Sequence, residues 1–264
     1  MYNFEYKKAG SVAEAASIIG ADADAKLVAG GMTYIPTLKQ RLAAPTTVVD
    51  MNGLGDLAGI SVAGDTVTIG AMTRHAAVAC SADVAAAIPA LADLAGHIGD
   101  PQVRNRGTIG GSIANNDPAA DYPAGLVGLG ATVKTNRREV GADDFFIDMF
   151  ETALEQDEIV TSVSFPKPVK AAYMKFPNPA SRYAITGVFV AQAHDGVRVA
   201  VTGAGPCVFR VAAMEAALSS NWSADAVADI SVSADGLNED IHASAEYRAH
   251  LITVMAKRAV AKAG

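Results

Sequence analysis

The chain has 264 residues, of which half are apolar and 19% are charged, and its formal net charge is −7. This composition is typical of a globular protein with one large or two modest domains, and the absence of a basic excess argues against nucleic acid as a partner. No apolar run is long enough to span a bilayer, and the N-terminal residues lack the pattern of a signal peptide.

The two cysteines argue against structural disulfides and against a cysteine-ligated metal site. Cys80 and Cys207 are isolated in the sequence, so they form neither a disulfide framework nor a Cys-x-x-Cys metal or iron–sulfur site. We therefore expect a cytoplasmic protein that holds no metal of its own.

The first glycine-rich segment follows a short apolar strand. Tyr2–Tyr6 predicts one strand and Lys26–Val28 another, which leads directly into Ala29-Gly30-Gly31-Met32-Thr33. Helical sequence follows from Tyr34 to Leu42. A strand, a glycine-rich loop and a helix in this order place main-chain N–H groups where an anionic group such as a pyrophosphate can bind.

The next segment excludes one familiar nucleotide-binding fold. Gly53–Ala58 matches a loose G-x-G-x-x-A pattern, but a dinucleotide site requires a helix directly after the glycines. Here Ile60–Val62 and Thr66–Ile69 alternate around Gly64-Asp65, which predicts a β-hairpin. We therefore reject a Rossmann unit at this point.

An alanine-rich helical region extends from Thr73 to Ile98 with a break near Pro89. His75 and His97 lie in it, too far apart for a metal site, and are interpreted as surface or capping residues. Cys80 is expected to be a small buried residue.

The second glycine-rich segment is Thr108-Ile109-Gly110-Gly111-Ser112, and the chain is organised around it. Asn116-Asp117-Pro118 then predicts a helix that runs to Gly130, with Asp117 as its cap. A tight turn between two buried strands is the alternative interpretation of the glycines. Two such segments in one chain favour a ligand that carries phosphate.

The last hundred residues have strands first and helices last, which predicts an α+β unit. Glu158–Pro166 is interpreted as an edge strand that ends at the Pro166/Pro168 pair, where we place a domain boundary. The elements predicted after it are strands at 172–176, 185–194 and 197–203 and helices at 210–218 and 244–263.

Taken together, the two glycine-rich segments resemble a known family. A-G-G-M-T-Y-I-P at Ala29–Pro36 and T-I-G-G-S-I-A-N at Thr108–Asn115 are similar to the FAD-binding signatures of the flavoprotein subunit of molybdenum hydroxylases, and most similar to the medium subunits of aerobic carbon monoxide dehydrogenases. Asp100–Gly107, Arg182-Tyr183-Ala184 and Asp240–Arg248 also fit, so the resemblance covers essentially the whole chain.

The resemblance implies an α+β fold. A PCMH-type FAD-binding domain, as in vanillyl-alcohol oxidase, would occupy residues 1–168, with two α/β subdomains at about 1–52 and 53–168. A small α+β C-terminal flavoprotein domain would occupy residues 169–264.

It also implies the residues that bind FAD. The two glycine-rich segments would hold the pyrophosphate through main-chain N–H groups. Asp121 matches a carboxylate that binds FAD, Val160 an apolar flavin-wall position, Lys175 more loosely a basic position, and Tyr183 a tyrosine that covers one face of the isoalloxazine ring. The full set is Ala29, Gly30, Gly31, Met32, Thr33, Thr108, Ile109, Gly110, Gly111, Ser112, Asp121, Val160, Lys175 and Tyr183.

One departure and three alternatives accompany these assignments. The family often has His or Asn where this chain has Met32, so a polar contact from that side chain is missing. Each of three residues also has an interpretation without FAD. Asp121 would interact favourably with a helix N-terminus, Tyr183 would be an ordinary core tyrosine, and Lys175 would be a surface residue.

The implied function is electron transfer in an oxidoreductase complex. A large molybdopterin-binding subunit would oxidise the substrate, a small subunit would carry two [2Fe–2S] clusters, and this chain would pass electrons through FAD to an external acceptor. The complex would be a dimer of heterotrimers. No acid–base pair or activated nucleophile is evident, so we expect no catalytic side chain here. The alternatives are a stand-alone FAD oxidase and a non-catalytic nucleotide-binding scaffold subunit.

Overall fold

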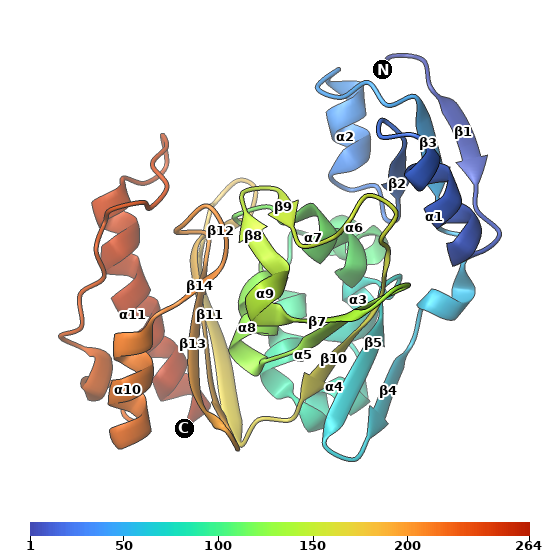
Figure 1. Cartoon of the computed structure of the whole chain (residues 1–264). Helices are drawn as coiled ribbons and strands as arrows, with labels where there is room; N and C mark the ends of the chain where they lie inside the picture. The colour runs from blue at the N-terminus through green and yellow to red at the C-terminus, as the bar shows by residue number, and fades with distance from the viewer.

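A computed structural model describes residues 1–264, and its first unit is a small parallel sheet with strand order β1-β3-β2 (Figure 1). Both pairings are parallel, so the connections cross over through helices rather than tight turns. β2 is an edge strand of this sheet, and the first glycine-rich segment follows directly after it. The elements are β1 (Glu5–Lys8), α1 (Val12–Ala21), β2 (Lys26–Val28), α2 (Tyr34–Lys39) and β3 (Thr47–Asp50).

The second unit contains a five-stranded sheet with order β4-β5-β10-β6-β7. The hairpin expected around Gly64 is confirmed by the antiparallel pairing of β4 with β5. The edge-strand prediction for Glu158–Pro166 was wrong, because β10 lies between β5 and β6 in the centre of the sheet. Pro166 is tolerated as the last residue of the strand. The bounds are η1 (Gly55–Leu57), β4 (Ile60–Ala63), β5 (Thr66–Gly70), β6 (Thr132–Thr135), β7 (Glu139–Gly141) and β10 (Val160–Pro166).

Short helices cover this sheet. The alanine-rich region forms three helices rather than one broken helix, because Ser81 starts a new one by accepting a hydrogen bond from the Val84 amide. The prediction that Cys80 is buried was wrong, since it is exposed at the end of the preceding helix. The bounds are α3 (His75–Ala79), α4 (Ala82–Ala87), α5 (Pro89–Gly96), α6 (Pro101–Arg106), α7 (Ile109–Asn115), α8 (Tyr122–Leu129) and α9 (Ala142–Phe145), followed by the hairpin β8 (Phe146–Asp148) and β9 (Glu151–Thr152).

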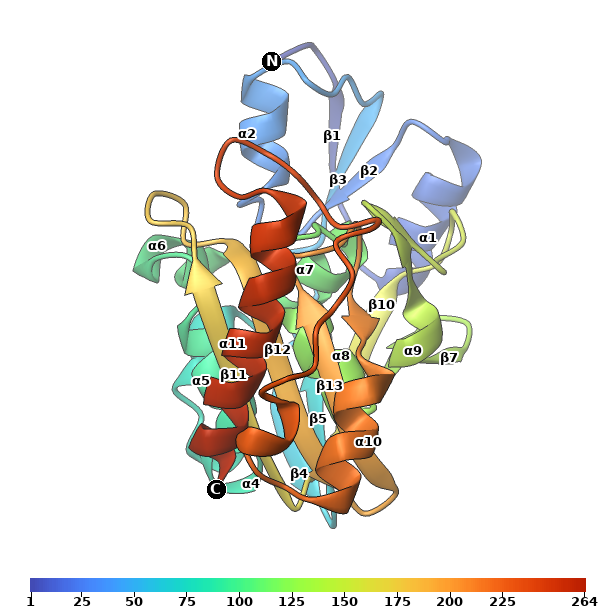
Figure 2. The same cartoon turned by 90° about the vertical axis from the view of Figure 1, so that its left-hand side faces the viewer.

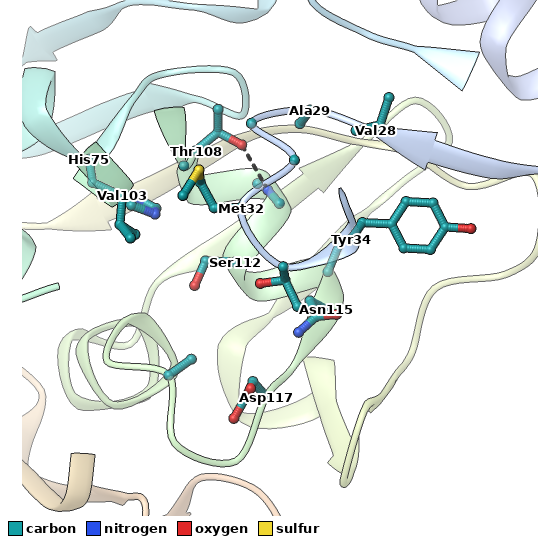
Figure 3. A pocket seen from close by; sticks show the side chains of 18 of the residues that line it. Val28, Ala29, Met32, Tyr34, His75, Val103, Thr108, Ser112, Asn115 and Asp117 are labelled. Atoms are coloured by element: carbon teal, nitrogen blue, oxygen red, sulfur yellow. Dashed lines mark hydrogen bonds between the residues drawn. The ribbon is translucent and has the colours of Figure 1, made fainter. Parts of the chain in front are cut away.

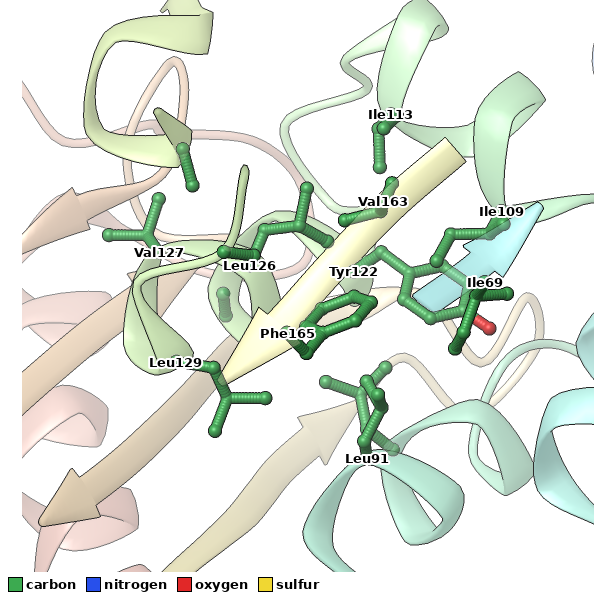
Figure 4. Packing of buried hydrophobic residues seen from close by; sticks show 14 of the residues in the cluster. Ile69, Leu91, Ile109, Ile113, Tyr122, Leu126, Val127, Leu129, Val163 and Phe165 are labelled. Atoms are coloured by element: carbon green, nitrogen blue, oxygen red, sulfur yellow. The ribbon is translucent and has the colours of Figure 1, made fainter. Parts of the chain in front are cut away.

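The largest core lies between this sheet and its helices. Figure 4 shows Val163 and Phe165 on β10 facing Tyr122 and Leu126 of α8, with Leu91 of α5 on the other side of Phe165. All five side chains are fully buried. Of the helices around this core, α7 lies close to the first unit (Figure 1).

The third unit is a four-stranded antiparallel sheet with order β11-β12-β13-β14. The helices α10 and α11 cover one face (Figure 2), and α5 and α8 pack on the other. The central strand β12 is therefore buried from Ala184 to Ala191. Gly128 of α8 allows this contact, because a Cβ there would lie 2.6 Å from the Phe189 ring. The bounds are β11 (Lys170–Pro177), β12 (Ala184–Ala193), β13 (Gly196–Thr202), β14 (Phe209–Arg210), α10 (Ala212–Ser220), η2 (Asp225–Val227) and α11 (Ala245–Ala263).

The helix expected to begin at Pro118 begins instead at Tyr122. The carbonyl of Pro118 accepts a hydrogen bond from the Gly203 amide, and the carbonyl of Ala120 accepts one from the Thr202 hydroxyl. These bonds to the C-terminal sheet hold the segment in a turn. The α+β fold class is confirmed, and none of the helices is long and apolar enough to cross a bilayer.

Candidate cofactor site

A cavity of about 710 Å³ lies where the three units meet. Residues from the first glycine-rich segment, from the second, and from the loop between β11 and β12 line it together. Figure 3 shows Met32 of the first segment beside Thr108 of the second, with Ser112 and Asp117 further along the same wall. The volume is in the range of cavities that enclose cofactors and other small ligands.

The two glycine-rich segments abut each other at Gly30. A Cβ on Gly30 would lie 2.1 Å from the carbonyl oxygen of Arg106 and 2.8 Å from the Cα of Gly107, so only glycine fits. Gly31 has a φ of +75°, which also favours glycine. The close approach joins two segments that are nearly eighty residues apart in the sequence.

The main-chain N–H groups of the first segment are free. No hydrogen bond within the protein engages the amides from Ala29 to Thr33, although the carbonyl of Ala29 accepts one from the Asn52 side chain at 2.8 Å. Unpaired amides in a glycine-rich turn can donate to a phosphate. This segment therefore offers the anion-binding donors that its sequence predicts.

The second segment differs from the predicted loop, because residues 109–115 form helix α7 and Thr108 caps it. The Thr108 hydroxyl accepts a hydrogen bond from Gly111 N at 3.2 Å, and the Gly110 amide donates to the carbonyl of Ala71. These amides are thus engaged within the protein. The segment instead presents the Ser112 hydroxyl, which has no hydrogen-bond partner and faces the cavity (Figure 3).

A buried ion pair lies beside the cavity. Lys175 Nζ is 2.9 Å from Asp121 Oδ1, and both side chains are only 4% exposed. The Tyr173 hydroxyl donates to the same carboxylate at 2.6 Å. Burial raises the pKa of Asp121 above its ordinary value, while Lys175 acts in the opposite direction. The surface interpretation of Lys175 was therefore wrong.

The same lysine holds the loop between β11 and β12. Lys175 Nζ donates to the carbonyl of Arg182 at 2.9 Å and to that of His97 at 2.8 Å. Arg182 has a left-handed φ of +64°, and Tyr183 follows it at the cavity wall. Since Tyr183 is 42% exposed, it is not an ordinary core tyrosine.

Most of the predicted site residues converge. Twelve of the fourteen line the cavity; Ile109 points into the core and Lys175 lies behind Asp121. Asp121 directly precedes α8, but its side chain makes no capping hydrogen bond. Its main partners are the lysine and tyrosine described above, which sequence spacing does not reveal.

Sequence reasoning missed several cavity residues, of which His75 and Phe150 are the most informative. His75 is buried rather than exposed, and burial, with a smaller effect from Arg104, lowers its pKa to about 4. Its imidazole occupies the space that a Cβ on Gly107 would take. Phe150 reaches the cavity from the β8–β9 hairpin with a φ of +57°. No local sequence signal marks either position.

Two hydrogen bonds from the Asn116 side chain hold the hairpin that carries Phe150. The Asn116 side chain is fully buried and donates to the carbonyls of Asp148 and Glu151, each at 2.8 Å. Asn116 itself has a φ of +42°, a conformation that asparagine tolerates better than most residues. This contact keeps the hairpin at the cavity.

The residues present fit FAD. The free amides and the Ser112 hydroxyl suit phosphate oxygens, and a buried carboxylate suits ribose or ribityl hydroxyls. Apolar side chains such as Val160 and Phe150 provide walls for a flat ring system. An unpaired Nδ1 on buried His75 adds a further polar atom beside the cavity.

Comparison with known proteins identifies the family. Residues 2–168 match the model described as the FAD binding domain in molybdopterin dehydrogenase, and residues 171–263 match the CO dehydrogenase flavoprotein C-terminal domain. The chain belongs to this family of FAD-binding oxidoreductase subunits. The resemblance seen in the sequence, the fold class and the FAD cofactor are thereby confirmed.

Individual relatives span nearly the whole chain. The nicotine 6-hydroxylase medium subunit of Paenarthrobacter nicotinovorans is 34% identical over 98% of this chain and 96% of its own length. The carbon monoxide dehydrogenase medium chain of Hydrogenophaga pseudoflava is 35% identical over 97% and 96%. Among solved structures, quinoline 2-oxidoreductase from Pseudomonas putida 86 matches with a TM-score of 0.89 at 28% identity, covering 99% of this chain and 96% of that one.

Proposed function

We propose that this chain is the FAD-binding electron-transfer subunit of a molybdenum hydroxylase. The observation that carries the proposal is the convergence of two glycine-rich segments on one cavity, in a family that binds FAD. Bound FAD supplies the electron-carrying chemistry, and the protein supplies binding and orientation. No acid–base pair beside the cavity needs to act on a substrate.

The residues then divide into four roles. The amides from Ala29 to Thr33 hold the phosphates, and the first turn of α7, from Thr108 to Ser112, closes the other side. Asp121 accepts hydrogen bonds from sugar hydroxyls, Val160 forms part of the ring wall, and Tyr183 covers one ring face. Lys175 acts on the site through Asp121 and through the carbonyl of Arg182.

Relatives that are named as medium subunits or medium chains support a role within a multi-subunit complex. We propose that a large molybdopterin-binding subunit oxidises the substrate, that a small [2Fe–2S] subunit delivers electrons to this chain, and that the whole is a dimer of heterotrimers. An external acceptor takes the electrons. Two free thiols, one of them exposed, support a reducing cytoplasmic location.

We propose the same domain division as the sequence predicts. The FAD-binding domain comprises residues 1–168, with subdomains at about 1–52 and 53–168, and the C-terminal domain comprises residues 169–264. The end of β10 at Pro166 and the start of β11 at Lys170 support this boundary.

The decisive experiment is the visible absorbance spectrum of the purified chain, with the released cofactor identified by chromatography. Paired flavin bands and free FAD after denaturation are expected. A colourless protein that takes up no added FAD would refute the proposal and favour a scaffold subunit. Co-expression with the neighbouring subunits, followed by gel filtration, then tests whether the chain enters a complex, and a chain that stays monomeric would contradict the electron-transfer role.

A further inference from the structure

A second cavity, of about 480 Å³, lies beside the cofactor cavity and shares Gly99 and Arg182 with it. Its lining is almost entirely polar or glycine and proline, with Met174 as the one large apolar side chain. Cationic side chains dominate the polar part, contributed by Arg104, Lys175, Arg182 and Lys262. Such a lining is unsuited to an apolar ligand.

Two arginines converge on a single atom in this cavity. Arg104 Nη1 donates to the carbonyl oxygen of Gly99 at 3.2 Å, and Arg182 Nη1 approaches the same oxygen at 3.5 Å. Arg104 also donates to the carbonyl of Ile98 at 3.0 Å. Two like charges that share one carbonyl repel each other unless an anion lies between or beside them.

The arginines have no counter-ion within the protein. Lys175 is paired with Asp121, and Lys262 is paired with Asp93 at 2.8 Å, so these two lysines are neutralised. No carboxylate lies within 4.0 Å of either guanidinium. The cavity therefore carries an excess of positive charge in a chain whose net charge is −7.

The donors of both guanidinium groups are largely unused. Arg182 makes only the long contact to Gly99, and Arg104 uses Nη1 alone. A planar guanidinium with free donors binds phosphate oxygens in a bidentate manner, and two of them can hold one phosphoryl group. The main-chain position of Arg182 is fixed independently by Lys175, which binds its carbonyl.

We propose that this second cavity, which we call the arginine cavity, binds a phosphoryl anion through Arg104 and Arg182. The anion is either free phosphate or the phosphate of a small ester whose remainder extends toward the cofactor cavity, since the two cavities share Gly99 and Arg182. The site is separate from the phosphates of FAD, which the amides from Ala29 to Thr33 are proposed to hold. The inference therefore goes beyond the proposed function.

Calorimetric titration of the full chain, saturated with FAD, tests the site with two probes. Inorganic phosphate and adenosine 5′-monophosphate are titrated separately, and flavin absorbance reports independently whether FAD is bound. Arg104→Gln and Arg182→Gln are each expected to weaken binding by at least about tenfold, because each removes charge-assisted hydrogen bonds to the anion. Arg258→Gln removes an exposed arginine outside the cavity and is expected to change nothing.

Comparing the affinities of the two probes distinguishes free phosphate from a phosphate ester as the ligand. Equal affinity for both probes indicates free phosphate, and tighter binding of the nucleotide indicates an ester; both support the site if the cavity variants lose binding. Arg182 is exposed and its side chain holds no other element, so its variant remains informative if the Arg104 variant fails to fold. No saturable binding of either probe, or equal affinity in wild type and Arg182→Gln, would overturn the proposal.

Discussion

The buried pair between Lys175 and Asp121 provides the sharpest test of how this site is stabilised. Replacing Lys175 with Met removes the cation but keeps most of the side-chain volume. Asp121 then remains 4% exposed, with only the Tyr173 hydroxyl as a side-chain partner. Breaking a buried ion pair by removing one partner costs about 3–5 kcal/mol.

The structure also predicts how this cost depends on pH. Burial raises the pKa of Asp121 from its ordinary value of 3.8, and the loss of Lys175 raises it further. A pKa that is raised in the fold means that stability is recovered as pH falls toward 3.8, so the deficit is expected to be smaller at pH 5 than at pH 7.

Urea unfolding of the wild type and of Lys175→Met at pH 7 and at pH 5 measures the stability deficit of the variant at each pH. Two controls sharpen the result. Asp121→Asn combined with Lys175→Met removes both charges and is expected to recover much of the lost stability, because no unpaired charge remains. Lys134→Met removes an exposed lysine with a distant carboxylate partner, and is expected to have little effect at either pH.

Two results would refute the reasoning. A Lys175→Met deficit that is equal at pH 5 and pH 7 would show that the cost arises from lost packing rather than from the stranded Asp121 charge. A double variant as unstable as the single one would show that the lysine acts mainly through its hydrogen bonds to the carbonyls of His97 and Arg182.

Three further predictions concern other parts of the molecule. Gly30→Ala places a Cβ 2.1 Å from the carbonyl oxygen of Arg106 and is expected to weaken FAD binding about tenfold in a fluorescence titration. Gly96→Ala is the control, because a Cβ at Gly96 has no atom within 4 Å, and it should leave FAD binding unchanged. Asn116→Ala should cost about 2 kcal/mol and expose the β8–β9 hairpin to limited proteolysis, because two carbonyls lose their donor; an uncut hairpin would contradict this. The hydrogen bond from Arg138 lowers the pKa of Glu158 from 4.5 to about 2, so the stability that this contact contributes is lost as pH falls from 4.5 to about 2. We therefore expect Arg138→Gln to be less stable than wild type at pH 7. In acid unfolding curves, the difference between the two proteins should close over that pH range.

The two glycine-rich segments show how far local chemistry determines the site. Each was identified from residue type and order, and nine of their ten residues line one cavity. The hairpin at Gly64 was predicted for the same reason, since a tight turn depends on the conformational freedom of two residues. These features require nothing from distant parts of the chain.

Other features depended on partners far away in the sequence. β10 lies in the centre of its sheet because β5 and β6 pair with its two edges, and neither pairing is visible in its alternating sequence. The turn before α8 is not helical because the C-terminal sheet donates hydrogen bonds to it. A propensity for helix at this point was overridden by tertiary contacts.

The sequence by itself thus determined the cofactor-binding segments and the local turns, because backbone freedom and hydrophobic periodicity are short-range properties, and its motifs carried the resemblance to the family. The tertiary structure alone decided which polar side chains are buried and with whom. Lys175 and His75 read as surface residues, yet Lys175 is buried against Asp121 and His75 against Gly107. Burial and ion pairing join segments more than thirty residues apart, and no local pattern encodes the distance between them.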